Sequence, residues 1–267
     1  MDDKPSEHLG LYHEHGLSFY VDTGSEKLLF DFGSGSHTVA NAEKLDVPLK
    51  DISFAIGSHG HYDHAGGYPA CVDAGLRCPL VTGKGFFTEK YAIDDVCATY
   101  LGNGFDLKYL TEHQIRHLEC DGMLKLSEDA YVLNAFARSY DFETIPERFV
   151  LRHNGEWVQD NFTDEICLVV KLAGGVFVIV GCSHPGILNI LTSVEERFHM
   201  PILGVAGGTH LMEASDERIR RTLTIMEGFG ISVIGFNHCS GDRLRSIVGE
   251  YPKLHAVYLG AGDSLFL

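Results

Sequence analysis

The stretch SHGHYDHAGG, residues 58–67, constrains the fold of this chain more than any other feature. It places His59, His61, Asp63 and His64 within six residues, directly after ISFAIGS, a short apolar run that predicts a buried strand. At a strand end, His59 and His61 can converge on one metal ion, and Asp63 and His64 on a neighbouring one. Imidazole nitrogens with a carboxylate suit zinc, and iron and manganese also fit. We therefore predict one or two divalent ions at this loop.

Three further apolar runs end in the same way, each with a metal-ligand side chain just beyond it. VFVIVGCSHPG carries Cys182 and His184, PILGVAGGTHL carries His210, and ISVIGFNHCSG carries His238 and Cys239. If these runs are parallel neighbouring strands, their carboxyl ends share one edge of a sheet, where such sheets place their sites. We therefore predict that they supply further ligands, although each histidine taken singly also fits a place in the core.

The remaining histidines lack this context. We expect them at the surface or behind the ligands: His8, His13, His15, His37, His113, His117, His153, His199 and His255. The seven cysteines are odd in number and scattered, with no CxxC pair, which favours reduced thiols over a disulfide framework.

The rest of the chain predicts a mixture of strands and helices around one core. Apolar and amphipathic patterns predict strands at 17–23, 27–33, 52–58, 165–172, 176–182, 201–208 and 231–236, and helices at 37–46, 186–198 and 215–228. HAVYLG and SLFL predict short closing strands. We expect one domain, 1–267, in which residues 84–130 are aromatic and weakly periodic. This segment is either a lid over the site or a structural insertion.

The charge of the chain limits its partners. The formal net charge is −16, from 37 acidic and 21 basic residues, so the surface repels nucleic acid and anionic membranes. No apolar run approaches the roughly 18 residues of a membrane span. The opening MDDKPSEHLG lacks the pattern of a secretory signal. We therefore expect a cytoplasmic protein that acts on a small molecule, with no nucleic-acid or membrane partner.

SHGHYDHAGG and its preceding strand resemble the signature of the metallo-β-lactamase superfamily. Asp31, in LLFDFG, matches an aspartate that supports that site from behind. The wider chain is similar to a narrower branch, the dihydropterin-(ribofuranosyl)aminobenzene-phosphate synthase-like proteins, through EHGLSFYV, DEICLVV, GCSHPGILN, GGTHL and HCSG. The resemblance implies the α/β (α+β) class and an αββα sandwich with a dinuclear site between the sheet edges.

The same resemblance implies which residues bind each ion. It implies His59 and His61 for the first metal, with His184 as our choice of its third histidine, and Asp63 and His64 for the second metal. His238, in HCSG, matches the last histidine of the family. Cys182 stands where the superfamily usually has a bridging aspartate, and Asp164 and Glu165 stand where its third histidine usually precedes a strand. Cys182 is therefore a further candidate ligand.

Such a site predicts a metal-dependent hydrolase that uses metal-activated hydroxide on a small phosphoester or ester, a phosphodiester for example. Asp63 would orient the hydroxide, and His210 would bind the substrate or protonate the leaving group. The branch name implies instead a transferase that joins a ribose pyrophosphate to a pterin precursor and releases pyrophosphate. Two other interpretations are a di-iron redox site, against which the absence of a flavodoxin-like segment counts, and a non-catalytic, metal-bearing binding protein.

Overall fold

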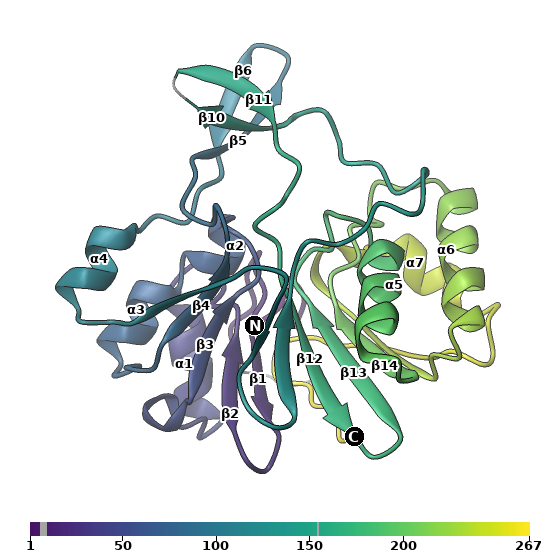
Figure 1. Ribbon diagram of the computed structural model, residues 1–267, viewed down its shortest axis with the longest axis horizontal. Coiled ribbons are helices and arrows are strands. Elements are labelled where there is room, and N and C mark those ends of the chain that lie inside the picture. The colour runs from purple at the N-terminus through teal and green to yellow at the C-terminus, as the bar shows by residue number, and fades with distance from the viewer. Residues whose placement is uncertain (6–9, 154) are drawn as a thin grey trace.

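Two β-sheets lie face to face in the middle of the molecule (Figure 1). The computed structural model describes residues 1–5, 10–153 and 155–267. The first sheet has the order β1-β2-β3-β4-β7, with the strands β1 (Phe19–Asp22), β2 (Lys27–Phe30), β3 (Phe54–Gly57), β4 (Leu80–Gly83) and β7 (His117–Cys120). The second has the order β16-β15-β14-β13-β12-β9-β8, with the strands β8 (Met123–Lys125), β9 (Ala130–Leu133), β12 (Cys167–Leu172), β13 (Gly175–Val180), β14 (Ile202–Gly207), β15 (Val233–Phe236) and β16 (His255–Tyr258).

Helices cover the outer face of each sheet (Figure 1). The first sheet carries α1 (His37–Lys44), α3 (Tyr68–Asp73) and α4 (Leu107–Glu112), and the second carries α5 (Ile187–Phe198), α6 (Asp216–Gly228) and α7 (Asp242–Val248). One apolar core lies between the sheets, with Phe30 and Ile56 from the first and Leu168 and Ile179 from the second. Two further cores lie under the helices. The layers therefore follow the order αββα, and the predicted fold class is confirmed.

The local signals that predict α6 act as expected. The side chain of Ser215 accepts a hydrogen bond from the Arg218 N–H and caps the helix, while Ile219, Leu223 and Met226 are buried on one face. The predicted strand at SLFL is wrong, because the ring of Phe266 is 95% exposed and the segment pairs with no strand among the described residues. Burial rather than local composition decides whether so short a segment becomes a strand.

A third, smaller sheet stands above the sandwich (Figure 1). It has the order β11-β10-β5-β6 and is antiparallel throughout, with β5 (Lys90–Asp94), β6 (Cys97–Tyr100), β10 (Phe149–His153) and β11 (Glu156–Gln159). Residues 84–130 therefore divide between layers: β5 and β6 join this sheet, α4 joins an outer layer, and β7 and β8 join the two main sheets. The other two strands of the small sheet, β10 and β11, come from residues 149–159.

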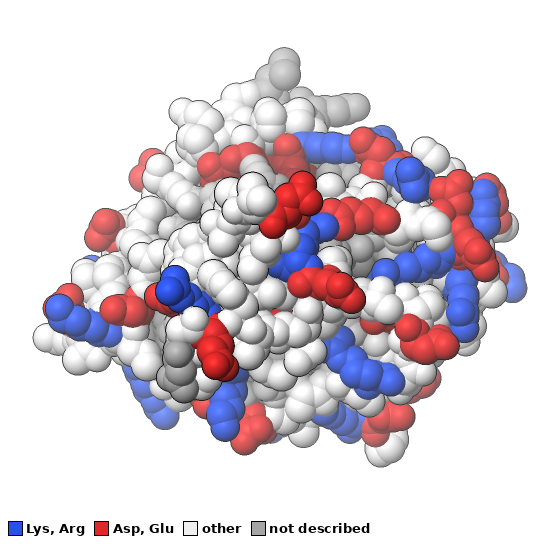
Figure 2. All heavy atoms as spheres, turned by 90° about the horizontal axis from the view of Figure 1, so that it is seen from above, with Lys and Arg blue, Asp and Glu red and all other residues white. Residues whose placement is uncertain are grey.

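Charges of both signs are interspersed over the face seen from above the small sheet (Figure 2). Among the described residues, no helix combines the length and apolar character needed to cross a bilayer. The expectation that neither nucleic acid nor membrane is a general partner stays a prediction.

Candidate metal centre

The loop that follows β3 carries the first four predicted ligands. His59 and His61 lie in its extended part, and the short helix α2 (Tyr62–Ala65) begins immediately afterwards and carries Asp63 and His64. All four side chains are buried. The loop packs tightly at Gly60, where a Cβ atom would lie 2.2 Å from the Phe86 carbonyl oxygen. Only glycine fits this approach.

His59, His61 and His184 form a group that we call the histidine cluster. The ring centroid of His59 lies 4.6 Å from that of His61 and 5.0 Å from that of His184, and the last two are 5.1 Å apart. Burial lowers the pKa of each ring well below its ordinary value, so all three are neutral. Among the described residues, His59 Nε2 and both ring nitrogens of His184 have no hydrogen-bond partner. Buried nitrogens without partners are costly, and a metal ion would satisfy them.

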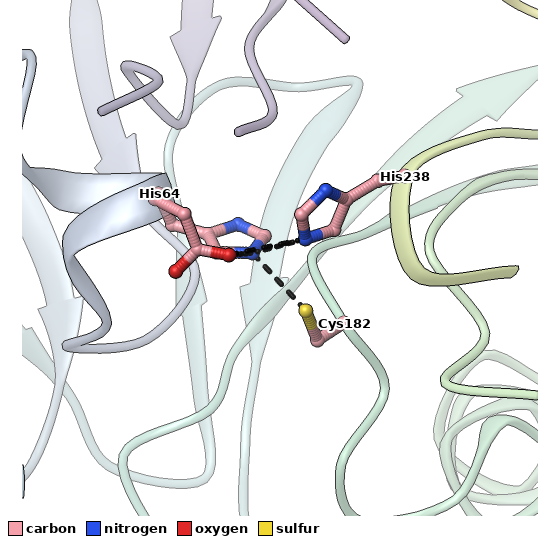
Figure 3. A group of neighbouring side chains, drawn as sticks. His64, Cys182 and His238 are labelled. Carbon is pink, nitrogen blue, oxygen red and sulfur yellow. Dashed lines mark hydrogen bonds and ion pairs between the residues drawn. The ribbon is translucent and has the colours of Figure 1, made fainter. Parts of the chain in front are cut away.

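Asp63, His64, Cys182 and His238 form a second group, the mixed cluster. Each offers one donor atom, and these atoms lie within 4.8 Å of one another. His64 Nε2 is 3.1 Å from Cys182 Sγ and 3.2 Å from His238 Nε2, and the three side chains point toward one another (Figure 3). The Asp63 carboxylate is 3.2 Å from His238 Nε2. This donor set of two imidazoles, a carboxylate and a thiol suits a divalent ion, zinc in particular.

Two carboxylates fix which ring nitrogens of the mixed cluster face inward. Asp31 accepts a hydrogen bond from His64 Nδ1 at 2.7 Å, and Asp3 accepts one from His238 Nδ1 at 2.7 Å. The Nε2 lone pairs of the two histidines therefore face each other, and a cation between them, either a proton or a metal ion, is needed to offset their repulsion. Burial alone would lower the pKa of His238, but its hydrogen bonds with Asp3 and Asp63 raise the pKa well above the ordinary value.

Asp31 also holds the loop itself. Its carboxylate accepts hydrogen bonds from the Ser58 N–H at 2.7 Å and from Ser58 Oγ at 2.8 Å. Ser58 Oγ in turn lies 2.9 Å from His59 Nδ1. Asp31 therefore lies behind His64, where the resemblance places it, and it ties the ends of β2 and β3 together.

Cys182 belongs to both groups. Its Sγ lies within 4.8 Å of donor atoms of His59 and His184 on one side, as well as of the mixed cluster on the other. The thiol therefore lies within reach of donor atoms of both groups. Burial raises the pKa of Cys182 well above its usual value, and Cys239 and the Asp63 carboxylate raise it further. A nearby cation is therefore required to form the thiolate.

Three parallel neighbouring strands deliver the later residues of the site. β13, β14 and β15 pair in parallel, as the sequence predicts, and their carboxyl ends lead to His184, His210 and His238. His210 lies beside the histidine cluster rather than in it: its ring centroid is 4.4 Å from that of His184, and its side chain is partly exposed. This position suits a group that meets a substrate.

The carboxylates of Asp164 and Glu165 accept hydrogen bonds from backbone N–H groups of the loops that carry the candidate ligands. Asp164 accepts a hydrogen bond from the Gly60 N–H at 2.9 Å. Glu165 accepts bonds from the N–H groups of Ser183 and His184 at 2.6 and 3.0 Å. The acidic pair that replaces the superfamily's usual third histidine therefore positions the loops that carry His59, His61 and His184.

Backbone strain is concentrated at this edge of the sandwich. Five of the ten described non-glycine residues with left-handed backbone lie here: Asp31 (φ 58°), Phe162 (φ 48°), Ser183 (φ 60°), His210 (φ 49°) and His238 (φ 51°). Residues held in this conformation commonly mark functional sites.

Sequence reasoning missed two residues that contact the mixed cluster. Asp3 binds His238, as described above, and His15 Nε2 lies 3.3 Å from the Asp63 carboxylate. His15 has no strand before it, and only the motif EHGLSFYV singled out its surroundings. Of the other histidines expected at the surface or behind the ligands, His8 lies outside the described residues.

Comparisons with known proteins agree with this geometry. A family model for the metallo-β-lactamase superfamily matches residues 12–75. The chain is similar to the crystal structure of Tm1679, described as a metal-dependent hydrolase of the β-lactamase superfamily, with a TM-score of 0.82 and 29% identity over 97% of this chain and 94% of that one.

Two proteins of Methanocaldococcus jannaschii are also similar in sequence. One, named 7,8-dihydropterin-6-methyl-4-(β-D-ribofuranosyl)-aminobenzene-5′-phosphate synthase, is 28% identical over 267 residues, which cover 92% of this chain and 89% of that protein. The other, named MJ0448, is 28% identical over 237 residues, or 86% of this chain and 85% of that protein. The matched residues, the shared fold and the synthase relative together confirm the resemblance: residues 12–75 match the metallo-β-lactamase superfamily model, and the chain has the fold of a structure described as belonging to that superfamily.

Proposed function

We propose that this protein is a metal-dependent hydrolase of a small phosphoester or ester, with a dinuclear centre formed by the histidine cluster and the mixed cluster. One observation carries the proposal: the two clusters are buried side by side and share Cys182. Similarity to a metal-dependent hydrolase over almost the whole chain supports it. Zinc suits the nitrogen and sulfur donors best, although manganese or iron also fits the histidines and the carboxylate.

The residues of the site have separable tasks in this reaction. Bound divalent ions supply Lewis-acid activation of water and of a substrate oxygen. Asp63, at the junction of the mixed cluster with the solvent side, orients the attacking water. His210 lies partly exposed beside His184 and is placed to donate a hydrogen bond or proton to the leaving group. Asp31, Asp164 and Glu165 keep the ligands in position.

A cavity beside the site supports a substrate with an anionic group. Its volume is about 450 Å³, and its lining includes Lys84, Arg138, Phe162 and Pro185. The Phe162 ring stacks on His184 with centroids 3.7 Å apart, so the cavity adjoins the histidine cluster. The lining also includes one acidic residue, Asp121, so the two cationic side chains leave the cavity with a positive balance on a chain of net charge −16. This balance favours binding of a phosphate or carboxylate.

The second candidate is a synthase that forms a phosphorylated ribofuranosyl-aminobenzene dihydropterin. The observation that favours it is the relative of that name, which covers 92% of this chain. Both candidates use the same ligands and an anionic substrate, so geometry alone does not separate them. They differ in the reaction: hydrolysis consumes water, whereas the synthase joins two substrates and releases pyrophosphate.

The test combines metal analysis with an assay. Protein purified without added metal is analysed for its elements and assayed with bis-p-nitrophenyl phosphate and with simple phosphate and carboxylate esters. The proposal expects about two ions per chain and turnover that Asp63→Ala abolishes, whereas Asp73→Ala, an exposed aspartate on α3, leaves it intact. Two bound ions without turnover of any ester, together with pyrophosphate release from pterin and phosphoribosyl substrates, would establish the synthase instead.

A further inference from the structure

Asp3 joins the beginning of the described chain to the mixed cluster. One of its carboxylate oxygens accepts a hydrogen bond from His238 Nδ1 at 2.7 Å, and the other accepts one from His15 Nδ1 at 2.9 Å. The first oxygen also accepts the Gly16 N–H at 3.0 Å. The Asp3 carboxylate thus binds two imidazole rings, and in each ring it binds the Nδ1 nitrogen.

Both rings point their other nitrogen at the same atom. His238 Nε2 lies 3.2 Å and His15 Nε2 lies 3.3 Å from Asp63 Oδ2. The two ring centroids are 5.0 Å apart. Carboxylates that bind the outer nitrogen of a metal-ligating histidine fix its tautomer and orientation. Asp31 does this for His64, and Asp3 does it for His238, but Asp3 alone holds a second histidine.

The position of His15 is built into the fold. The next two residues rest on the helix that carries Asp63: the Leu17 N–H donates to the Asp63 carbonyl oxygen at 3.1 Å, and a Cβ atom on Gly16 would lie 2.6 Å from that oxygen. The His15 side chain is 55% exposed, whereas that of His238 is 1% exposed. His15 therefore forms the solvent-facing side of the mixed cluster.

We propose that Asp3 is a positioning residue of the mixed cluster and that His15 is a further residue of that site, which holds the Asp63 carboxylate from the solvent side for a second divalent ion. The inference rests on the proposed dinuclear centre but not on the reaction that this centre performs. If it holds, the residues around the second ion include Asp3 and His15, which lie well before SHGHYDHAGG in the sequence.

The test measures metal affinity and not turnover. Metal-stripped protein is titrated with Co²⁺ and followed by calorimetry and by the visible absorption of the bound ion. Wild type is expected to bind two ions. Asp3→Asn and His15→Gln are each expected to weaken the second ion about 10- to 100-fold and to leave the first unchanged. His255→Gln, an exposed histidine on β16, is the matched control and should bind as wild type does.

The outcomes separate this inference from the proposed function. Wild-type affinities in both variants, an equal loss in the His255 control, or a wild type that binds a single ion would each overturn the inference. Because His15 is exposed, His15→Gln is expected to unfold at the wild-type temperature, which keeps the result interpretable if Asp3→Asn folds poorly. Protein that shows the expected pattern of affinities but hydrolyses no ester would retain this inference and refute the hydrolase.

Discussion

Lys90 provides a direct test of how the small sheet is joined to the site. It lies on β5, its side chain is 2% exposed, and its ammonium group lies 2.6 Å from Asp160 and 2.9 Å from Asp164, whose side chains are each 3% exposed. Asp164 in turn accepts the Gly60 N–H in the ligand loop. Lys90→Met keeps the aliphatic volume but removes the charge, and with it the cation–π contact of the ammonium group with the Phe162 ring.

The expected cost follows from the burial of this ion pair. Without the ammonium, two buried carboxylates are left with no positive partner, and breaking a buried pair in this way costs about 3–5 kcal/mol. Burial already raises the pKa of Asp160, even with Lys90 beside it. In the variant the pKa of Asp160 should rise further, so its protonation relieves the destabilisation at low pH. We therefore expect the destabilisation to be largest near neutral pH and to shrink as the pH falls toward about 5.

Urea denaturation of metal-free protein, followed by circular dichroism, measures this cost at several pH values. For a chain of this size the expected change corresponds to a fall in melting temperature of roughly 6 to 20 °C. Lys125→Met, which breaks the exposed pair with Glu128, is the control and should leave the unfolding curve unchanged. A loss below about 1 kcal/mol in Lys90→Met at neutral pH would refute the reasoning, because it would mean that the carboxylates do not depend on the ammonium.

Three further predictions concern the clusters and the thiols. In metal-free protein the histidine cluster stays neutral, so below about pH 6.5 the unfolded chain binds more protons than the folded one. The free energy of unfolding should therefore fall toward pH 5 by up to about 1.4 kcal/mol per pH unit for each histidine. A free energy of unfolding that does not change over this pH range, measured by denaturation, would contradict the prediction. Cys182→Ser should weaken both Co²⁺ binding steps and abolish the sulfur-to-cobalt absorption band, whereas Cys97→Ser should do neither; an unchanged band would remove Cys182 from the ligands. An aromatic disulfide reagent should react quickly with one thiol of the native protein, that of the exposed Cys97. The buried thiols should react slowly, because burial raises the pKa of Cys71 and Cys78, for example, to about 12. Fast reaction that persists in Cys97→Ser would disprove this.

The sequence predicts the sandwich well because its strands carry their own signals. β13, β14 and β15 are short apolar runs that each end in a ligand-type side chain, and parallel pairing brings those ends to one edge. The histidines at these ends therefore meet the SHGHYDHAGG loop, as the pattern predicts. Local periodicity, together with the rule that parallel strands bring their carboxyl ends to one edge of a sheet, is sufficient to predict this part of the structure.

Other parts depend on contacts that no local pattern records. Asp3 and His238 are separated by 235 positions in the chain, and nothing in the polar segment around Asp3 predicts their hydrogen bond. The small sheet pairs β5 with β10, which follows some fifty residues later, so neither segment shows that it belongs to a sheet by itself. Residues 84–130 are divided among four different layers, which explains why their aromatic residues follow no single period.

The place of Cys182 between the two clusters makes this centre sensitive to oxidants. A carboxylate in that position would be inert to peroxide, whereas a thiolate can be oxidised first to a sulfenic acid, which a thiol can reverse, and then irreversibly to a sulfinic acid. Since the one sulfur lies within reach of both groups of ligands, its oxidation would remove a donor from both at once. Thiol reductants during purification would then preserve the metal content of the protein as much as its cysteines.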